Sequence, residues 1–191
     1  MNITISINEV LRDVLGKFQN VYEKYHNTEL ENDIITPNLL DYVDFKTQDE
    51  LFDFLYEEAP MEIFGQAKET EINIISHLVD LYKNLPNGYR LRLVSDDFGR
   101  GKAATLWFLA KYGMVVDEII FYSIKNLDYV WSLTDIFITS DVDIIESKPA
   151  DKKLIILNKV YNESLEGDLK IESLKDIETF VGLLEEEYEK K

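Results

Sequence analysis

Apolar residues recur along this chain at two alternating spacings. Ile3, Ile5 and Ile7 alternate with polar residues, which predicts a strand, and the apolar positions from Val10 to Tyr22 recur every three or four residues, which predicts a helix directly after it. A second strand is predicted at 89–94, and short apolar runs predict further strands at 118–123, 135–140 and 153–158. Helical spacing predicts helices at 48–58, 69–85, 129–133, 142–147 and 173–189, and a further helix that follows the turn at 95–102, contains residues 106–112 and ends at Gly113.

Short buried strands that alternate with helices are typical of an α/β fold. We expect a doubly wound, Rossmann-like parallel sheet of about five strands, with helices on both faces. The periodicity fades after residue 28, so we expect a small helical insert at about 28–85 within one domain. The core would then comprise residues 1–27 and 86–191.

Aromatic residues mark two of these segments. Trp107, Phe108, Tyr112 and Trp131 lie at helical spacing among apolar residues, so we interpret them as core. The segment 52–64 (FDFLYEEAPMEIF) is either a partner surface or the insert's own core, and we favour the core.

The charge balance limits the possible partners. With 37 acidic against 20 basic residues, the net charge of -17 repels nucleic-acid phosphates and anionic lipids, so we expect no direct binding to nucleic acid or membranes. The chain has no cysteine, which excludes disulfides and cysteine chemistry. Its first residues lack the basic and apolar pattern of a secretory signal, and no apolar run reaches the roughly 20 residues of a membrane helix. We therefore expect a protein that is not secreted and is cytoplasmic or contained in a larger particle.

Ligands of a doubly wound sheet bind beyond the carboxyl ends of its strands, so those ends are the candidate site. The first strand ends at Ser6 with Asn8 and Glu9 following, the second ends at Ser95, and a later strand ends at Thr139 and Ser140. These positions carry mainly hydroxyls and amides.

The end of the first strand resembles the nucleophile motif of the haloacid-dehalogenase (HAD) superfamily, Asp-x-Asp-Gly-Val. The resemblance places Ser6 at the nucleophilic aspartate, Asn8 at the acid-base aspartate and Glu9 where a glycine often lies. Thr139 and Ser140 stand where two acidic residues would hold magnesium, and Asp141 comes one place late.

Other parts of the family pattern are present. Ser95 matches the hydroxyl that holds the transferring phosphate, and Lys102 matches the cationic motif. NEVLRD after the first strand, the helical insert and the late segment LNKVYNESLEGDLKIESLKDIE are similar to the nucleotidase-type members, although Val160 replaces their proline.

The missing acids have a chemical consequence. A serine hydroxyl needs a nearby base to become a nucleophile, and Asn8 cannot supply one. Magnesium sites use carboxylates, whereas Ser6, Asn8, Thr139 and Ser140 offer neutral oxygens. We therefore expect no cofactor, with Mg²⁺ as the alternative.

Two clusters allow a different interpretation. The acidic residues Asp96, Asp97, Asp141 and Asp143 could form a displaced metal site, with Asp96 and Asp141 as its candidates, but we favour helix capping. The turn that contains Arg100 and Lys102 lies beside Ser95 and is either a phosphate cradle or a solvated turn. His26 and His77 lack metal-ligand spacing, and we do not assign them as bases.

The sequence therefore predicts a catalytically inactive HAD-like protein that acts through protein partners, as a structural or binding subunit of a larger assembly. Degenerate phosphatase domains of this kind resemble proteins of tailed phages of gut bacteria, so a phage virion component is one form of this hypothesis. The alternatives are a magnesium-dependent nucleoside monophosphate phosphatase with a displaced metal site, and a non-hydrolysing binder of a phosphorylated ligand through Ser95, Lys102 and Arg100.

Overall fold

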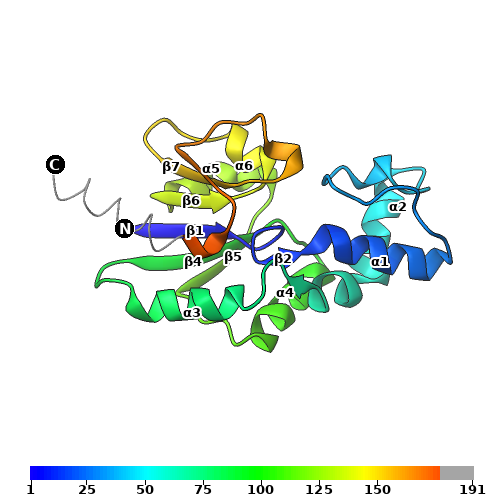
Figure 1. Ribbon diagram of the computed structural model, residues 1–191, viewed down its shortest axis with the longest axis horizontal. Helices are drawn as coiled ribbons and strands as arrows, with labels where there is room; N and C mark the ends of the chain where they lie inside the picture. The colour runs from blue at the N-terminus through cyan, green and yellow to red at the C-terminus, as the bar shows by residue number, and fades with distance from the viewer. Residues whose placement is uncertain (177–191) are drawn as a thin grey trace.

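A six-stranded sheet forms the centre of the molecule in the computed structural model, which describes residues 1–176 (Figure 1). Its order is β5-β4-β1-β6-β7-β8, and all neighbouring strands are parallel. The strands are β1 (Asn2–Ser6), β4 (Arg90–Ser95), β5 (Glu118–Phe121), β6 (Ile136–Thr139), β7 (Lys153–Leu157) and β8 (Leu169–Ile171). The α/β doubly wound class is thus confirmed, with one more strand than expected.

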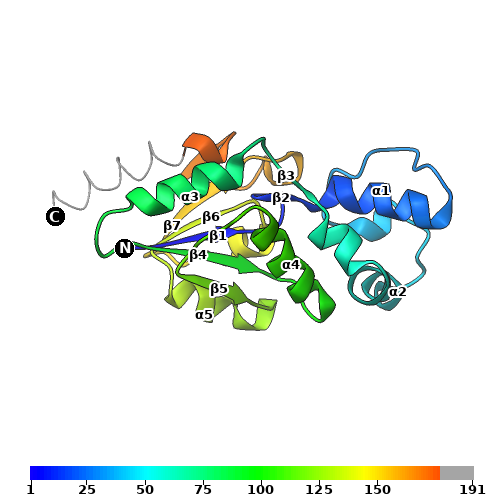
Figure 2. The same cartoon turned by 90° about the horizontal axis from the view of Figure 1, so that it is seen from below.

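Helices cover both faces of this sheet (Figure 2). On one face, α3 (Ile74–Asn84) and α4 (Arg100–Lys111) pack against Ile3, Ile5 and Leu93. On the other face, α5 (Leu127–Ser132) and α6 (Val142–Glu146) pack against strand residues such as Phe137 and Ile156. Strands that are buried on both faces account for the continuous apolar runs in the sequence.

A helical insert occupies residues 14–67 and lies at one end of the sheet (Figure 1). It begins after β2 (Arg12–Asp13) and ends before β3 (Lys68–Glu69), two short strands that pair antiparallel. It contains α1 (Val14–His26), α2 (Gln48–Asp53) and single π-helical turns at Phe54–Glu58 and Met61–Gly65. Aromatic side chains form much of its core, among them Phe18, Tyr22, Phe54 and Phe64.

Packing divides the chain differently from the expected insert at 28–85. The apolar face of α1 is buried with the insert, and that of α3 is buried against the sheet. Both helices are amphipathic, so periodicity does not reveal which apolar surface each one covers. Most apolar residues of segment 52–64 belong to the insert's core, as we favoured, although Phe52 and Met61 are each 38% exposed.

Two helix starts and one core assignment were wrong. Val10 and Leu11 are buried in the turn after β1, and α1 begins only at Val14. The helix expected from residue 69 begins at Ile74, because Glu69 pairs with Arg12 in the β2–β3 ribbon. Trp107 is 45% exposed and is not a core residue.

The last part of the described chain contains a strand that was not predicted and the start of a predicted helix. The additional strand β8 has only three residues, which is too short for periodicity to detect. The helix expected at 173–189 lies mainly outside the described residues, which end in a 3-10 turn at Leu174–Asp176.

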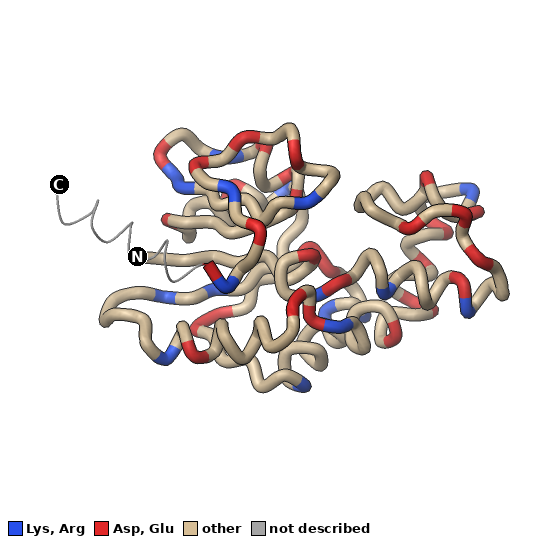
Figure 3. The backbone as a smooth tube through the Cα atoms, in the orientation of Figure 1, with Lys and Arg blue, Asp and Glu red and all other residues tan. Residues whose placement is uncertain are grey.

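The fold distributes the acidic residues over the whole described chain. Acidic positions are spread over the insert as well as over the sheet end, with few basic positions between them (Figure 3). Within residues 1–176, no helix is long and apolar enough to cross a membrane.

The sheet order determines where a site can form. The chain leaves β1 toward β4 and β5 on one side, and then crosses to β6 and β7 on the other side. The carboxyl end of β1 is therefore the topological switch point, where ligands bind in doubly wound sheets. The ends of β1, β4 and β6 bring Ser6, Ser95 and Thr139 to this edge.

Candidate functional site

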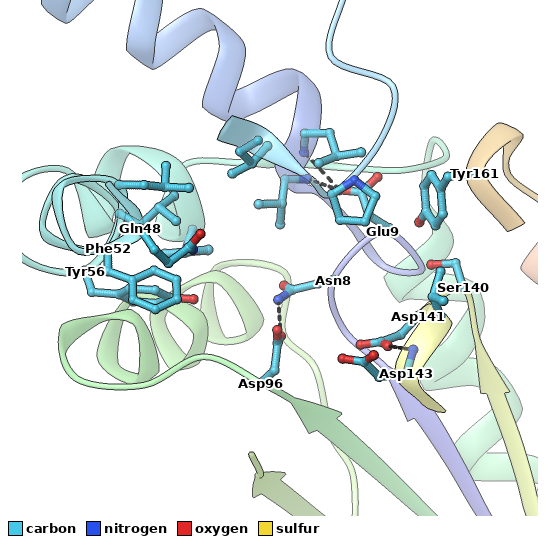
Figure 4. Close-up of a pocket in the computed structure, with 18 residues that line it drawn as sticks. Asn8, Glu9, Gln48, Phe52, Tyr56, Asp96, Ser140, Asp141, Asp143 and Tyr161 are labelled. Atoms are coloured by element: carbon cyan, nitrogen blue, oxygen red, sulfur yellow. Dashed lines mark hydrogen bonds between the residues drawn. The ribbon is translucent and has the colours of Figure 1, made fainter. Parts of the chain in front are cut away.

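A cavity of about 350 Å³ lies beyond the carboxyl end of β1, between the sheet and the insert (Figure 4). The sheet side contributes Asn8, Glu9, Asp96, Ser140, Asp141, Val142, Asp143 and Tyr161. The insert side contributes Val14, Leu15, Pro37, Leu39, Gln48, Leu51, Phe52, Leu55, Tyr56 and Phe64. The cavity thus has a polar, acidic side and an apolar, aromatic side.

Ser6, at the end of β1, has another hydroxyl as its partner. Its Oγ lies 2.7 Å from Thr139 Oγ1, and both residues are buried. Thr139 Oγ1 also accepts a hydrogen bond of 3.0 Å from the Asp141 backbone N–H. Among residues 1–176, no carboxylate or imidazole is hydrogen-bonded to Ser6.

Asn8 connects a buried cation to two carboxylates. Its Nδ2 donates to Asp96 Oδ1 at 2.9 Å and to Asp97 Oδ1 at 3.3 Å. Its Oδ1 accepts from Arg12 Nε at 3.1 Å and from Arg12 Nη2. An amide has both the donor and the acceptor that this position requires, whereas a carboxylate would have acceptors only.

Arg12 is the centre of the buried network, and the sequence analysis missed it. Its guanidinium and the Asp97 carboxylate are both fully buried and lie 2.7 Å apart (Nη2 to Oδ2). Arg12 Nη1 also donates to Thr105 Oγ1 at 2.8 Å and to the Phe64 backbone carbonyl at 3.0 Å. An arginine inside the apolar run from Val10 to Leu15 was the available signal, because a charge there must find a buried partner.

Ser95, expected to face a phosphate, uses its hydroxyl inside this network. Ser95 Oγ donates to Asp97 Oδ2 at 2.6 Å, and the same carboxylate oxygen accepts from Thr105. Ser95 is 2% exposed and does not line the cavity. The hydroxyl therefore stabilises a buried carboxylate.

Glu9 has the backbone conformation of the glycine that the family resemblance suggests at this position. Its φ of 59° lies in the left-handed region, which glycine adopts without strain. Its side chain accepts from the backbone N–H groups of Val14 and Leu15 at 2.8 and 2.9 Å, so it caps the start of α1. Burial raises the pKa of Glu9 despite these hydrogen bonds and the nearby Lys159.

Asp141 caps α6, as the capping interpretation predicted. Its Oδ1 accepts from the backbone N–H groups of Asp143 and Ile144 at 2.8 and 3.2 Å, and its Oδ2 accepts from Tyr122 Oη at 3.1 Å. Burial is the main cause that raises the pKa of Asp141.

Capping was the wrong interpretation for Asp96 and Asp97. The helix that follows them, α4, has Gly99 at its N-cap and no side-chain cap. Asp97 pairs with Arg12, whereas Asp96 is exposed and lines the cavity. Partial desolvation, followed by the charges of Asp97 and Asp141, raises the pKa of Asp96 to about 6.

The two expected phosphate-binding cations lie outside the cavity lining. Arg100 Nε forms an ion pair with Glu57 Oε2 at 3.2 Å, and Arg100 Nη1 donates to the Glu57 carbonyl at 3.2 Å, so it connects α4 to the insert. Lys102 Nζ lies 5.5 Å from the centre of the Phe121 ring. The structure therefore does not bring Arg100 or Lys102 together with Ser6 and Asn8 around the cavity.

The segment after β7 returns to the cavity. Asn162 is fully buried, and its Nδ2 donates to the carbonyls of Ser140 and Leu157, at 3.1 Å each. The Tyr161 side chain forms part of the cavity wall. The Tyr-Asn turn thus joins the ends of β6 and β7.

The donors at this edge do not fit the magnesium ion that the family resemblance implies. The Ser6 hydroxyl bonds Thr139, the Asn8 amide directs its N–H groups toward Asp96, and both oxygens of Asp141 already accept hydrogen bonds. Mg²⁺ requires near-octahedral oxygen ligands, usually with one or two free carboxylates. Within the described range 1–176, no three His, Cys, Asp or Glu side chains are grouped to hold a metal ion.

Comparisons with known proteins identify the fold. No family model matches the sequence, and no curated protein matches it. A HAD-superfamily hydrolase (subfamily IA, variant 1) from Geobacter sulfurreducens is similar in structure, with a TM-score of 0.55 and 12% identity over 94% of this chain and 95% of that chain. A haloacid dehalogenase-like hydrolase from Burkholderia xenovorans aligns over 92% of this chain and 94% of that chain, with a TM-score of 0.48 and 13% identity. The first comparison, together with the six-stranded parallel sheet, leads to the conclusion that this chain has the fold of the HAD-superfamily hydrolases.

Proposed function

We propose that this chain is a catalytically inactive relative of the HAD-like hydrolases and acts as a binding subunit of a larger assembly. The observation that carries the proposal is the hydrogen bond between Ser6 Oγ and Thr139 Oγ1 at the end of β1. A hydroxyl whose partner is another hydroxyl has no base to remove its proton, so it is a poor nucleophile near neutral pH.

Asn8 supports the same proposal. Its side chain cannot accept and return a proton as a carboxylate does, and it is fixed between Arg12 and Asp96. The positions of the nucleophile and of the acid-base group therefore carry no titratable side chain. Such groups act as a unit, and losing them together typically leaves only residual catalysis from binding interactions.

The experiment is a phosphate-release assay on the purified full chain with nucleoside monophosphates and with p-nitrophenyl phosphate, each with Mg²⁺ or Mn²⁺. We expect no release above that of the Asp141→Asn and Asp96→Asn variants. Turnover that either substitution abolishes would overturn the proposal and support the magnesium-dependent nucleotidase alternative. One observation favours that alternative as a second candidate, since Asp96 and Asp141 both line the cavity.

On the family resemblance alone, we propose that the assembly is a tailed-phage particle. The test is mass spectrometry of purified virions from a phage that encodes the chain. We expect the chain at a fixed copy number per virion. Its presence only in the infected-cell cytoplasm would remove the virion role and leave the binding role to be tested separately.

A further inference from the structure

The cavity has two contrasting walls, and together they indicate a ligand class. Its polar side carries the carboxyl groups of Glu9, Asp96, Asp141 and Asp143, and none of the described residues that line it is lysine or arginine. Arg12 is paired with the buried Asp97, and Lys159, whose charge acts on Glu9, does not line the cavity. A phosphate would meet repulsion here, and a cation would meet attraction.

The opposite wall is aromatic and held rigidly. The Tyr56 ring stacks on Phe64 with centroids 5.3 Å apart and lies 3.8 Å from the centroid of Phe98, which comes from the loop after β4. Phe52 packs edge-on against Phe98 at 5.6 Å. Phe52 is 38% exposed and lines the cavity, so its ring can contact an organic cation, and apolar neighbours such as Leu39 and Leu51 suit an alkyl stem.

The Tyr56 hydroxyl is a second, independent feature of the cavity that suits a ligand. Tyr56 is only 8% exposed, and no residue in the described part of the chain forms a hydrogen bond with its hydroxyl. The hydroxyl points into the cavity, toward the side that holds Asn8 and Asp96 (Figure 4). The oxygen itself is not fully buried, so it is accessible from the cavity and can accept a hydrogen bond from a ligand.

We propose that the cavity binds an organic cation, a protonated amine or a guanidinium on a short alkyl stem. The stem lies against Phe52 and Leu51, the Tyr56 hydroxyl accepts one N–H, and Asp96 provides the opposite charge. A cavity of about 350 Å³ is large enough for a ligand of this size. The acidic insert and the net charge of -17 further concentrate cations around the opening. This inference depends on the proposed binding role of the cavity, and it holds whether or not residual turnover exists.

The experiment uses four probes with one common stem. Butylammonium, butylguanidinium, butyrate and butyl phosphate are titrated into the full chain at low ionic strength, with chemical shifts of the ring and amide protons as the readout. We expect saturable binding of the two cations and none of the two anions. Saturable binding of butyl phosphate with no binding of the cations would overturn the proposal and support a phospho-ligand binder.

Matched variants locate the binding. Tyr56→Phe removes only the hydroxyl, Asp96→Asn removes only the charge, and Asp151→Asn is a control on an exposed loop outside the cavity lining. We expect Tyr56→Phe and Asp96→Asn each to weaken cation binding about tenfold, as for a hydrogen bond to a charged group, and the control to leave it unchanged. Equal binding by all three variants, with folding verified by circular dichroism, would place the cation elsewhere and overturn the proposal.

The same cationic group could come from a free amine or from a basic side chain of a partner protein. The tripeptides Gly-Lys-Gly and Gly-Arg-Gly, with blocked termini, separate these sources. Binding of a tripeptide at least as tight as that of the butyl probe identifies a side-chain site. Binding of the free cation alone identifies a small-molecule site. If none of the cationic probes binds, the inference is wrong. The proposed loss of catalysis is tested separately by the phosphate-release assay.

Discussion

Asp96 and Asp97 are neighbours in the sequence, but one lines the cavity and the other is buried in a network of hydrogen bonds. Asp97 is fully buried and accepts hydrogen bonds from Arg12, Ser95 and Thr105. Asp96 lines the cavity and has a pKa raised to about 6, and among residues 1–176 its only side-chain partner is the Asn8 amide. The buried network satisfies its charges internally, whereas the Asp96 carboxylate keeps an oxygen available to a ligand in the cavity.

Asn8 connects these two regions and explains why an amide replaces an acid there. One side of the amide accepts from Arg12, and the other side donates to Asp96 and Asp97. An aspartate would be a third carboxylate beside two others. The loss of the acid at position 8 is thus coupled to the acids that follow β4, and restoring the family motif at this one position would conflict with them.

Removing the buried cation should have the largest effect. Arg12→Met leaves Asp97 buried without its counter-ion, and we expect unfolding to become easier by about 3–5 kcal/mol, measured by urea denaturation. The control is Arg100→Met, which breaks an exposed pair with Glu57 and should cost less than about 1 kcal/mol. If Arg12→Met and Arg100→Met lowered the free energy of unfolding equally, the buried ion pair would contribute no more to stability than the exposed one, and the prediction would be wrong.

Asn8→Asp should have the next largest effect. Repulsion from Asp96 and Asp97, together with the lost donor, should destabilise the chain by about 1–3 kcal/mol at pH 7. The double variant Asn8→Asp with Asp96→Asn restores a donor and acceptor pair and should recover most of this loss. A double-mutant cycle measures the coupling between positions 8 and 96. If the effects of the two single substitutions on the free energy of unfolding simply add in the double variant, the two positions are not coupled.

Asp141→Ala tests the cap at the edge of the cavity. The change removes the acceptor for two backbone N–H groups at the start of α6 and the partner of Tyr122. We expect a loss of about 1 kcal/mol in the free energy of unfolding. Asp151→Ala, on an exposed turn, serves as the control and should change this energy by no more than about 0.5 kcal/mol.

Asp96→Asn should change the free energy of unfolding least, and unlike the three preceding substitutions it should stabilise the chain. Because the pKa of Asp96 is raised to about 6 in the folded chain from an ordinary value of 3.8, the folded state binds its proton more tightly than the unfolded state. Ionised Asp96 therefore lowers stability as pH rises from about 4 to above 6. We expect the variant to be more stable at pH 7 by less than about 1 kcal/mol, because water in the cavity screens the charge.

This gain should disappear near pH 4, where Asp96 is protonated in the folded chain. Thermal unfolding of wild type and variant at both pH values measures it. A stability difference that does not change with pH would mean that Asp96 has an ordinary pKa.

The sequence alone determined the class of the fold and the ends of its central strands. Strands that are buried on both faces appear as short apolar runs, and their helices have a period of 3.6. Both patterns are local, so β1, β4, β6 and β7 were located within about two residues of their expected bounds. The hydroxyl and amide residues at the ends of those strands were identified for the same reason, since strand ends share one edge of a parallel sheet.

The tertiary structure decided which side chains are partners. Ser95 appeared free to hold a ligand, but it bonds Asp97, and Arg100 appeared close to the site, but it pairs with Glu57. Arg12 lies 85 residues from Asp97 in sequence, so no local pattern could pair them. Charge pairing depends on distances in space and on desolvation, and both arise only when distant segments pack together.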